Sequence, residues 1–156
     1  MSIEKVRKYL RTYGLDGQIR EFDNSSATVE LAAQTLNVEP GRIAKTLSFK
    51  SATGAIIIVT AGDTKIDNAK YKAQFGLKAK MLTAEEALAF TGHAVGGVCP
   101  FGIDEPGAEV FLDQSLKRFA TVFPACGSAN SAIELTPEKL AEIIPLKSWV
   151  DVSKPA

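Results

Sequence analysis

The unbroken apolar run Ala55–Val59 is the feature that most constrains the fold of this chain. A strand with one face in water alternates apolar and polar residues, so a continuous apolar run indicates a strand that is covered on both faces. The run is far shorter than the roughly 20 residues that a membrane-spanning helix needs. The chain has 156 residues, a length that suits one domain, and we expect residues 1–156 to form one domain around this central strand.

Helix and strand signals alternate along the rest of the chain. Residues 29–36 repeat apolar side chains at the spacing of one helix face, and Thr83 with Glu86 matches a capping box. Several expected strands are joined by links that are too short for a crossover helix. We therefore expect an α/β domain with a largely antiparallel or mixed sheet. The expected helices are 2–13, 27–36, 83–91 and 136–144, and a further helix that begins at a cap of either Asp63 or Asp67 and ends at Gly76. The expected strands are 18–22, 45–50, 55–60, 78–82, 109–112, 120–123 and 133–135.

Charge and cysteine content exclude several classes of protein. The chain carries 18 Lys and Arg against 18 Asp and Glu, which argues against a general nucleic-acid coat. Residues 1–80 nevertheless hold 13 Lys and Arg against 8 Asp and Glu, so a local basic patch can form. The first residues do not resemble a signal peptide, and Cys99 and Cys126 are expected to be reduced thiols of a cytoplasmic protein. With a single His, no metal site and no cofactor are expected.

The densest cluster of unusual residues is Gly96-Gly97-Val98-Cys99-Pro100-Phe101-Gly102. Glycine permits positive φ angles and close approach to the main chain, and proline stiffens the turn. Such a segment is either a plain tight loop or a loop whose backbone N–H groups bind an oxygen, as in oxyanion holes. It lacks the sequence of a Walker loop and the spacing of a dinucleotide-binding loop.

Three side chains near such segments are candidates for contact with a ligand. Lys45 lies among apolar residues at the start of an expected strand, where it either extends to solvent or enters a pocket as a point charge for a phosphate or carboxylate. Cys99 is either a thiol nucleophile activated by His93 or a small side chain that lines a pocket. Ser128 follows a second turn of small residues, which is either a plain connection or a ligand contact.

Three segments together resemble the YbaK/EbsC family, the free-standing relatives of the editing domain inserted in bacterial prolyl-tRNA synthetase. They are Ala44-Lys45-Thr46-Leu47 at a strand entry, the Gly96–Gly102 loop, and Gly127-Ser128 followed by Ile133-Glu134-Leu135-Thr136-Pro137. The resemblance extends over most of the chain, from Ser26 to Ile144.

The resemblance implies a mixed α/β fold with a curved, mainly antiparallel sheet flanked by helices. It implies the activity of a trans-editing aminoacyl-tRNA deacylase, which hydrolyses the ester between a wrong amino acid and the terminal adenosine of a tRNA. Lys45 matches a functionally important lysine of the family, and Gly127 matches a glycine of its late loop. The segment that surrounds the aminoacyl ester in the family is matched by Gly96, Gly97, Pro100 and Gly102.

The expected partners are the tRNA acceptor end and, as a second candidate, an aminoacyl-tRNA synthetase; no membrane is expected, and the chain is a monomer or a homodimer. The expected phosphate contacts are Lys65, Lys70, Lys72, Lys78 and Lys80. Two positions depart from the family pattern: Cys99 replaces a Ser or Thr, and Ala129-Asn130 replaces a basic residue and a glycine.

We hypothesise that Lys45 and Gly102 are the catalytic residues. Lys45 would anchor the acceptor end or polarise the ester, and loop N–H groups, Gly102 especially, would stabilise the oxyanion. The attacking group would be water or a hydroxyl or thiol of the substrate. The expected substrate-binding residues are Thr46, Gly96, Gly97, Val98, Cys99, Pro100, Phe101, Gly127 and Ser128.

Small side chains around this loop favour a small amino acid such as Cys, Ala, Ser or Thr. Two alternatives stay open at this point. One is a non-catalytic aminoacyl-binding or nucleotide-binding module with a regulatory role, and the other is a hydrolase that depends on Cys99.

Overall fold

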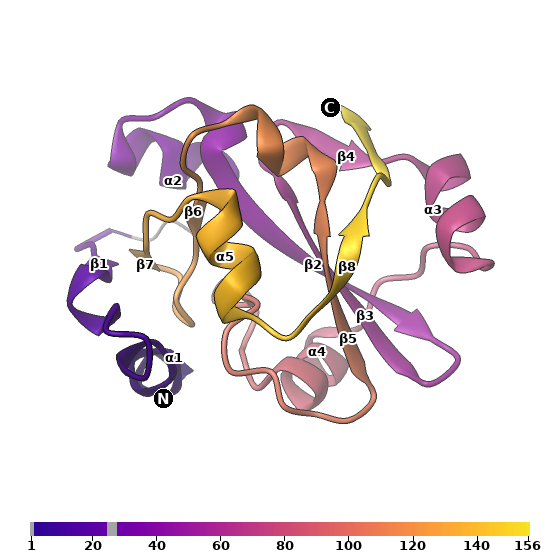
Figure 1. The fold of residues 1–156 in the computed structure, drawn as a ribbon, viewed down its shortest axis with the longest axis horizontal. Helices are drawn as coiled ribbons and strands as arrows, with labels where there is room; N and C mark the ends of the chain where they lie inside the picture. The colour runs from indigo at the N-terminus through magenta and orange to yellow at the C-terminus, as the bar shows by residue number, and fades with distance from the viewer. Residues whose placement is uncertain (1, 25–27) are drawn as a thin grey trace.

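A twisted, curved five-stranded sheet forms the centre of the molecule (Figure 1). The computed structural model describes residues 2–24 and 28–156. The strand order is β6-β2-β3-β5-β8, with bounds β2 Ile43–Ser51, β3 Gly54–Ala61, β5 Ala108–Asp113, β6 Phe123–Pro124 and β8 Leu146–Val150. Within β3, residues 55–59 are at most 4% exposed, which confirms the central strand predicted from the apolar run.

The sheet is mixed, and the expectation of a mainly antiparallel sheet is wrong for its five strands. β2 and β3 form one antiparallel hairpin, whereas β6 pairs parallel to β2, β5 parallel to β3, and β8 parallel to β5. The connections from β3 to β5 and from β5 to β8 contain whole helices, so they act as crossovers. Antiparallel pairs also form outside this sheet, between β1 (Arg20–Glu21) and β7 (Ser131–Ala132) and between β4 (Thr64–Ile66) and β9 (Ser153–Pro155).

The helices begin at the capping signals that the sequence contains. Asp67 and Thr136 accept hydrogen bonds from the first turns of their helices, and Thr83 forms the predicted reciprocal capping box with Glu86. The second helix is capped by Thr28, while Ser25 and Ser26, which the sequence also offers as caps, lie outside the described residues. The helices are α1 Ser2–Arg11, α2 Val29–Leu36, α3 Asn68–Phe75, α4 Ala84–Thr91 and α5 Pro137–Ile143, with 3-10 turns η1 Asp16–Gln18, η2 Pro40–Arg42 and η3 Gln114–Arg118.

Alternate side chains of β3 enter two separate hydrophobic clusters. Ile57 and Val59 pack in the larger cluster, with residues of α1, α5 and the Gly96–Gly102 loop. Ile56 and Ile58 pack on the opposite face with Tyr71 of α3. Because β2 pairs with β3, its successive residues also alternate between these two faces.

Two predicted strands are almost absent. Residues 78–82 form only an isolated bridge from Met81 to Phe49 of β2, and residues 133–135 form only an isolated bridge from Leu135 to Val122. The sequence did not predict β8 of the central sheet or the short strands β4 and β9.

Candidate functional site

A cavity of about 220 Å³ lies at the edge of β2. Lys45 and Thr46 line it from β2, Gly96 and Val98 from the Gly96–Gly102 loop, and Phe123 from β6. The family pattern in the sequence predicts one site for Lys45, Thr46 and the Gly96–Gly102 loop. The structure places the two residues of β2, Lys45 and Thr46, and the two loop residues, Gly96 and Val98, around the same cavity.

The cavity exists because part of the β2 edge has no neighbouring strand. β6 pairs with β2 only at Ile43 and Ala44. Farther along, the next contacts to this edge come from Leu82, whose amide N–H donates to the Ser48 carbonyl at 3.0 Å, and from the bridge at Phe49. The strand edge around Thr46 is therefore open among the described residues. Lys45 and Thr46 leave β2 on opposite faces, and both reach the cavity because it lies at this edge.

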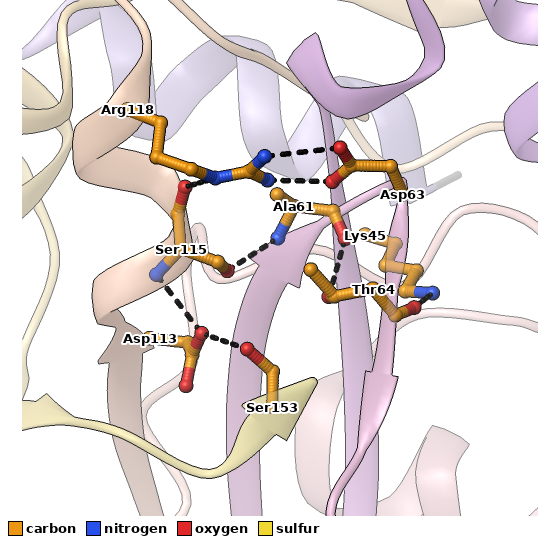
Figure 2. A network of polar contacts seen from close by, with 8 residues as sticks. All are labelled: Lys45, Ala61, Asp63, Thr64, Asp113, Ser115, Arg118 and Ser153. Atoms are coloured by element: carbon orange, nitrogen blue, oxygen red, sulfur yellow. Dashed lines mark hydrogen bonds and ion pairs between the residues drawn. The ribbon is translucent and has the colours of Figure 1, made fainter. Parts of the chain in front are cut away.

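Lys45 is half-buried, and its ammonium group has one hydrogen-bond partner among the described residues. Its Nζ donates to the backbone carbonyl of Thr64, the first residue of β4 (Figure 2). Burial lowers the pKa of Lys45, and the negative charges of Glu30 and Asp63 oppose this effect. An ammonium has three donor hydrogens, so the contact with Thr64 leaves two for a ligand.

A polar network holds Thr64 in place beside Lys45 (Figure 2). The Thr64 hydroxyl donates to the Ala61 carbonyl at 2.7 Å, and the Ala61 amide donates to the Ser115 hydroxyl at 3.1 Å. Arg118 forms a bidentate ion pair with Asp63, with N···O distances of 3.0 and 2.5 Å, and this pairing lowers the pKa of Asp63. The acceptor of the Lys45 ammonium is thus fixed from two sides.

The loop wall of the cavity depends on a close contact between two glycines. A Cβ on Gly97 would lie 2.5 Å from the carbonyl carbon and oxygen of Gly127, and Gly127 itself has a φ of 92°. Gly96 has a φ of 93°, in the left-handed region that favours glycine. The amide groups of Gly96 and Val98 have no hydrogen-bond partner among the described residues.

Cys99, Pro100 and Phe101 form the buried part of the loop and do not line the cavity. The Cys99 sulfur lies 3.5 Å from His93 Nε2, so the two residues considered as a nucleophile and its base are indeed neighbours. Both are 0% exposed, however, and burial raises the pKa of Cys99 to about 12. A thiol in this environment stays protonated and out of reach of a substrate.

Gly102 and Ser128 lie close to the site but do not line the cavity. A Cβ on Gly102 would be 3.3 Å from Cε of Lys5, so this residue faces α1. The Ser128 hydroxyl lies 2.7 Å from the hydroxyl of Ser131, and Ser131 does line the cavity. Of the departures from the family pattern, Asn130 is used structurally, since its side-chain amide donates to the Phe22 carbonyl at 2.8 Å.

Sequence reasoning missed the wall that α2 supplies and the two apolar residues at the cavity mouth. Val29, Ala32 and Leu36 of α2 line the cavity, although their helical spacing indicated only a core-facing helix. Met81 and Val95 also line it and are 57% and 71% exposed. Large apolar side chains with this exposure at a cavity are a signal that only the structure provides.

The described residues contain neither a membrane-spanning helix nor a cluster of metal ligands. None of the described helices is long and apolar enough to cross a membrane. Residues 2–24 and 28–156 also contain no group of three His, Cys, Asp or Glu side chains that could hold a metal ion.

Most of the sequence matches a family that is defined by an editing domain. A family model described as "Aminoacyl-tRNA editing domain" matches residues 23–143. The chain belongs to the aminoacyl-tRNA editing domain family.

Relatives of known sequence agree with this assignment. The chain is 54% identical over 155 residues to "Uncharacterized protein YwhH" of Bacillus subtilis (strain 168), covering 99% of this chain and 98% of the relative. It is 30% identical to "Putative Cys-tRNA(Pro)/Cys-tRNA(Cys) deacylase EbsC" of Enterococcus faecalis (strain ATCC 700802 / V583), covering 74% of this chain and 71% of the relative. It is also 32% identical to proline–tRNA ligase of Thermotoga maritima (strain ATCC 43589 / DSM 3109 / JCM 10099 / NBRC 100826 / MSB8), where the match covers 59% of this chain and 16% of the ligase.

Solved structures share the whole fold. A structure described as "Crystal structure of a putative trans-editing enzyme for prolyl tRNA synthetase" superposes with a TM-score of 0.87 at 29% identity, covering 98% of this chain and 97% of that chain. The crystal structure of hypothetical protein APE2540 superposes with a TM-score of 0.83 at 28% identity, covering 96% of this chain and 99% of that chain. The similarity to editing proteins therefore extends beyond the residues that the family model matches.

Proposed function

We propose that this protein is a free-standing aminoacyl-tRNA deacylase that hydrolyses the ester of a small, uncharged amino acid on a mischarged tRNA. The observation that carries the proposal is the shared cavity of Lys45, Thr46, Gly96 and Val98. Membership of the editing family supports this reaction class. The relative EbsC, whose name specifies Cys-tRNA(Pro) and Cys-tRNA(Cys), supports a small amino acid as substrate.

The lining of the cavity supports the size and charge of the proposed amino acid. Small side chains form much of its wall: Ala44, Ser48, Ala125, Ser131 and Ala132. Lys45 is the one charged residue among the described residues that line it, so a cationic side chain would meet a like charge. The wall suits Cys, Ala, Ser or Thr, and a pocket that only measures size separates such side chains by roughly 1–3 kcal/mol per methylene.

The proposed reaction is the addition of an oxygen or sulfur nucleophile to an activated ester. Water attacks the carbonyl carbon, the bond from this carbon to the ribose oxygen breaks, and the ribose oxygen takes up the proton that water gives up. A hydroxyl or thiol of the substrate itself is the alternative attacking group. The developing oxyanion needs hydrogen-bond donors, and one such donor is typically worth about 3–4 kcal/mol.

The donors in this proposal are the unpartnered amides of Gly96 and Val98. Both residues line the cavity, whereas Gly102, which the sequence favoured for this role, lies against Lys5 of α1. We therefore assign Gly102 to the support of the loop. Lys45 binds a phosphate or the ester carbonyl through the ammonium hydrogens that Thr64 does not use.

The tRNA acceptor end is the proposed partner, and the reaction belongs in the cytoplasm, where charged tRNA is used. The match to part of proline–tRNA ligase makes a synthetase a second proposed partner. A non-catalytic module that only binds an aminoacyl group in this cavity is the competing function. The thiol-dependent hydrolase is disfavoured because Cys99 is buried and its pKa is raised to about 12.

A deacylation assay with mischarged tRNAs distinguishes these functions. We expect the wild-type protein to release the amino acid, and Lys45→Ala to slow release by about tenfold or more while thermal unfolding stays unchanged. Lys147→Ala is the matched control, because Lys147 is exposed on β8 and does not line the cavity. Cys99→Ala is expected to remain active.

The other outcomes identify the alternatives. Absence of turnover with every tRNA, together with retained binding, would indicate the binding module. Loss of activity in Cys99→Ala alone would indicate a thiol nucleophile, and full activity of Lys45→Ala would remove this lysine from the mechanism.

A further inference from the structure

His93 is a completely buried imidazole whose two ring nitrogens contact different elements. It is 0% exposed and follows directly after the end of α4 at Gly92. Its Nδ1 forms a hydrogen bond with the hydroxyl of Ser2 in α1. Its Nε2 lies 2.8 Å from the backbone carbonyl oxygen of Phe101, in the Gly96–Gly102 loop. The ring therefore connects α1 to the base of this loop.

The partners of the ring define its protonation state. A carbonyl oxygen only accepts hydrogen bonds, so Nε2 must carry the hydrogen that binds Phe101. Nδ1 of a neutral ring then accepts from the Ser2 hydroxyl. Burial lowers the pKa of His93, and the positive charge of Lys5 in α1 adds to this effect, while the contact with Phe101 opposes it. Lys5 and the neighbouring thiol of Cys99 are the titratable groups that the structure places around the ring.

The contact with Phe101 fixes one peptide group of the loop. The Phe101 carbonyl and the Gly102 amide belong to the same planar trans peptide, so holding the carbonyl also orients the amide in the opposite direction. The same segment is held by Cys99, whose sulfur accepts hydrogen bonds from the amides of Phe101 and Gly127. The buried half of the loop is thus anchored, and the exposed half carries Gly96 and Val98 into the cavity.

We propose that His93 is a positioning residue, which fixes the Gly96–Gly102 loop against α1 and so places the Gly96 and Val98 amides at the cavity. Its effect on catalysis rests on the proposed deacylase function. The proposal gives α1, which lies outside the residues matched by the family model, a direct part in building the site.

Kinetics of two His93 variants test the catalytic part of this proposal. His93→Leu fills the space but removes both hydrogen bonds, and we expect kcat to fall about tenfold or more with KM for the mischarged tRNA changed less than about threefold. His93→Gln keeps an amide that can donate to Phe101, and we expect it to recover most of the lost kcat. Ser2→Ala, which removes only the contact to α1, should give an intermediate kcat.

Amide hydrogen exchange tests the positioning role without reference to activity. In His93→Leu, the hydrogen-bonded loop amides of Gly97, which donates to the Ala94 carbonyl at 3.0 Å, and of Phe101, which donates to the Cys99 sulfur, should exchange faster than in the wild type. Amides of α5, such as that of Leu140, should stay unchanged. If the wild type hydrolyses none of the tRNAs, the proposed function fails, and this exchange experiment still decides whether His93 holds the loop. If His93→Leu does not fold, the same comparison is made between the wild type, His93→Gln and Ser2→Ala.

Two results would overturn the proposal. One is unchanged exchange of the Gly97 and Phe101 amides in a folded variant that lacks the contacts of His93. The other is a wild-type kcat in folded His93→Leu. Loss of activity in His93→Gln equal to that in His93→Leu would also contradict it, because the restored donor would then have no effect.

Discussion

Lys45 and Cys99 belong to the two elements that build one cavity, but their environments give them opposite chemical properties. Lys45 is half-buried at the open edge of β2, where its ammonium keeps donors for a ligand. Cys99, in the buried part of the loop, is 0% exposed, and burial raises the pKa of its thiol to about 12. The lysine is therefore available for substrate and the thiol is not.

We predict that Cys99 is unreactive in the folded protein. At neutral pH, a thiol reagent such as iodoacetamide should label neither Cys99 nor the equally buried Cys126, because both thiols are protonated and enclosed. Mass spectrometry of the native protein and of protein unfolded in urea measures this. Both residues should be labelled in urea, and rapid labelling of native Cys99 would contradict the burial described here.

Some of the residues that the sequence predicts for the site line the cavity, and the others lie behind its wall. Lys45, Thr46, Gly96 and Val98 were all expected to contact substrate, because their segments carry the family pattern, and the structure places them around one cavity. The roles within the loop could not be derived, because spacing along an irregular segment does not tell which residues face outward. Gly102 was favoured as a donor for this reason, although it faces α1.

At the scale of secondary-structure elements, the close contact of Gly97 with Gly127 joins the Gly96–Gly102 loop to the turn before β7. The two main chains approach so closely that Gly97 has no space for a side chain. α1 packs behind them, since a Cβ on Gly127 would lie 2.7 Å from the Ser2 carbonyl. These contacts make the loop wall a product of three elements that are distant in sequence.

We predict that Gly97→Ala destabilises the protein by about 1–3 kcal/mol, because the added methyl group must displace main-chain atoms that lie 2.5 Å away. Deacylation should fall with it, since the loop wall moves. Urea unfolding and the deacylation rate measure the two effects. Gly17→Ala is the control, because a Cβ there meets nothing within 4 Å. Equal stability of Gly97→Ala and Gly17→Ala would contradict the close contact.

The strand pairing shows where element-level prediction fails. The hairpin of β2 and β3 was predicted because its turn is local in sequence. The parallel pairs of β3 with β5 and of β5 with β8 were missed, because local patterns do not show which distant strand pairs with which. The helix boundaries were predicted more closely, since the caps at Thr83 and Thr136 act through neighbouring residues.

At the scale of the whole molecule, exposed lysines gather around α3, on the face of the sheet from which Lys45 projects. Lys72 and Lys78 flank the same surface depression, and Lys65 and Lys80 are also exposed. Lys70 is partly engaged, since its ammonium contacts Asp151 at 3.1 Å and the Ser153 carbonyl at 2.9 Å. Five of the 13 Lys and Arg residues of residues 1–80 thus lie around α3, which makes this surface the candidate for contact with the phosphates of the proposed tRNA partner.

We predict that the combined change of Lys72, Lys78 and Lys80 to Ala raises KM for mischarged tRNA and flattens its dependence on salt. It should leave hydrolysis of a minimal aminoacyl-adenosine ester unchanged, because that substrate has no phosphate backbone. Steady-state kinetics at several salt concentrations measure both effects. The matched control changes Lys117, Lys139 and Lys147, which are carried by η3, α5 and β8. An equal effect of the two triple variants would argue against a binding surface around α3.

A structure of the protein with an amide-linked aminoacyl-adenosine, which cannot be hydrolysed, tests the central claim most directly. The account predicts that the aminoacyl group occupies the cavity at the β2 edge, with its carbonyl oxygen near the Gly96 and Val98 amides and a polar group of the adenosine at the Lys45 ammonium. Binding of the analogue elsewhere, with this cavity empty and Lys45 still directed only at Thr64, would contradict it.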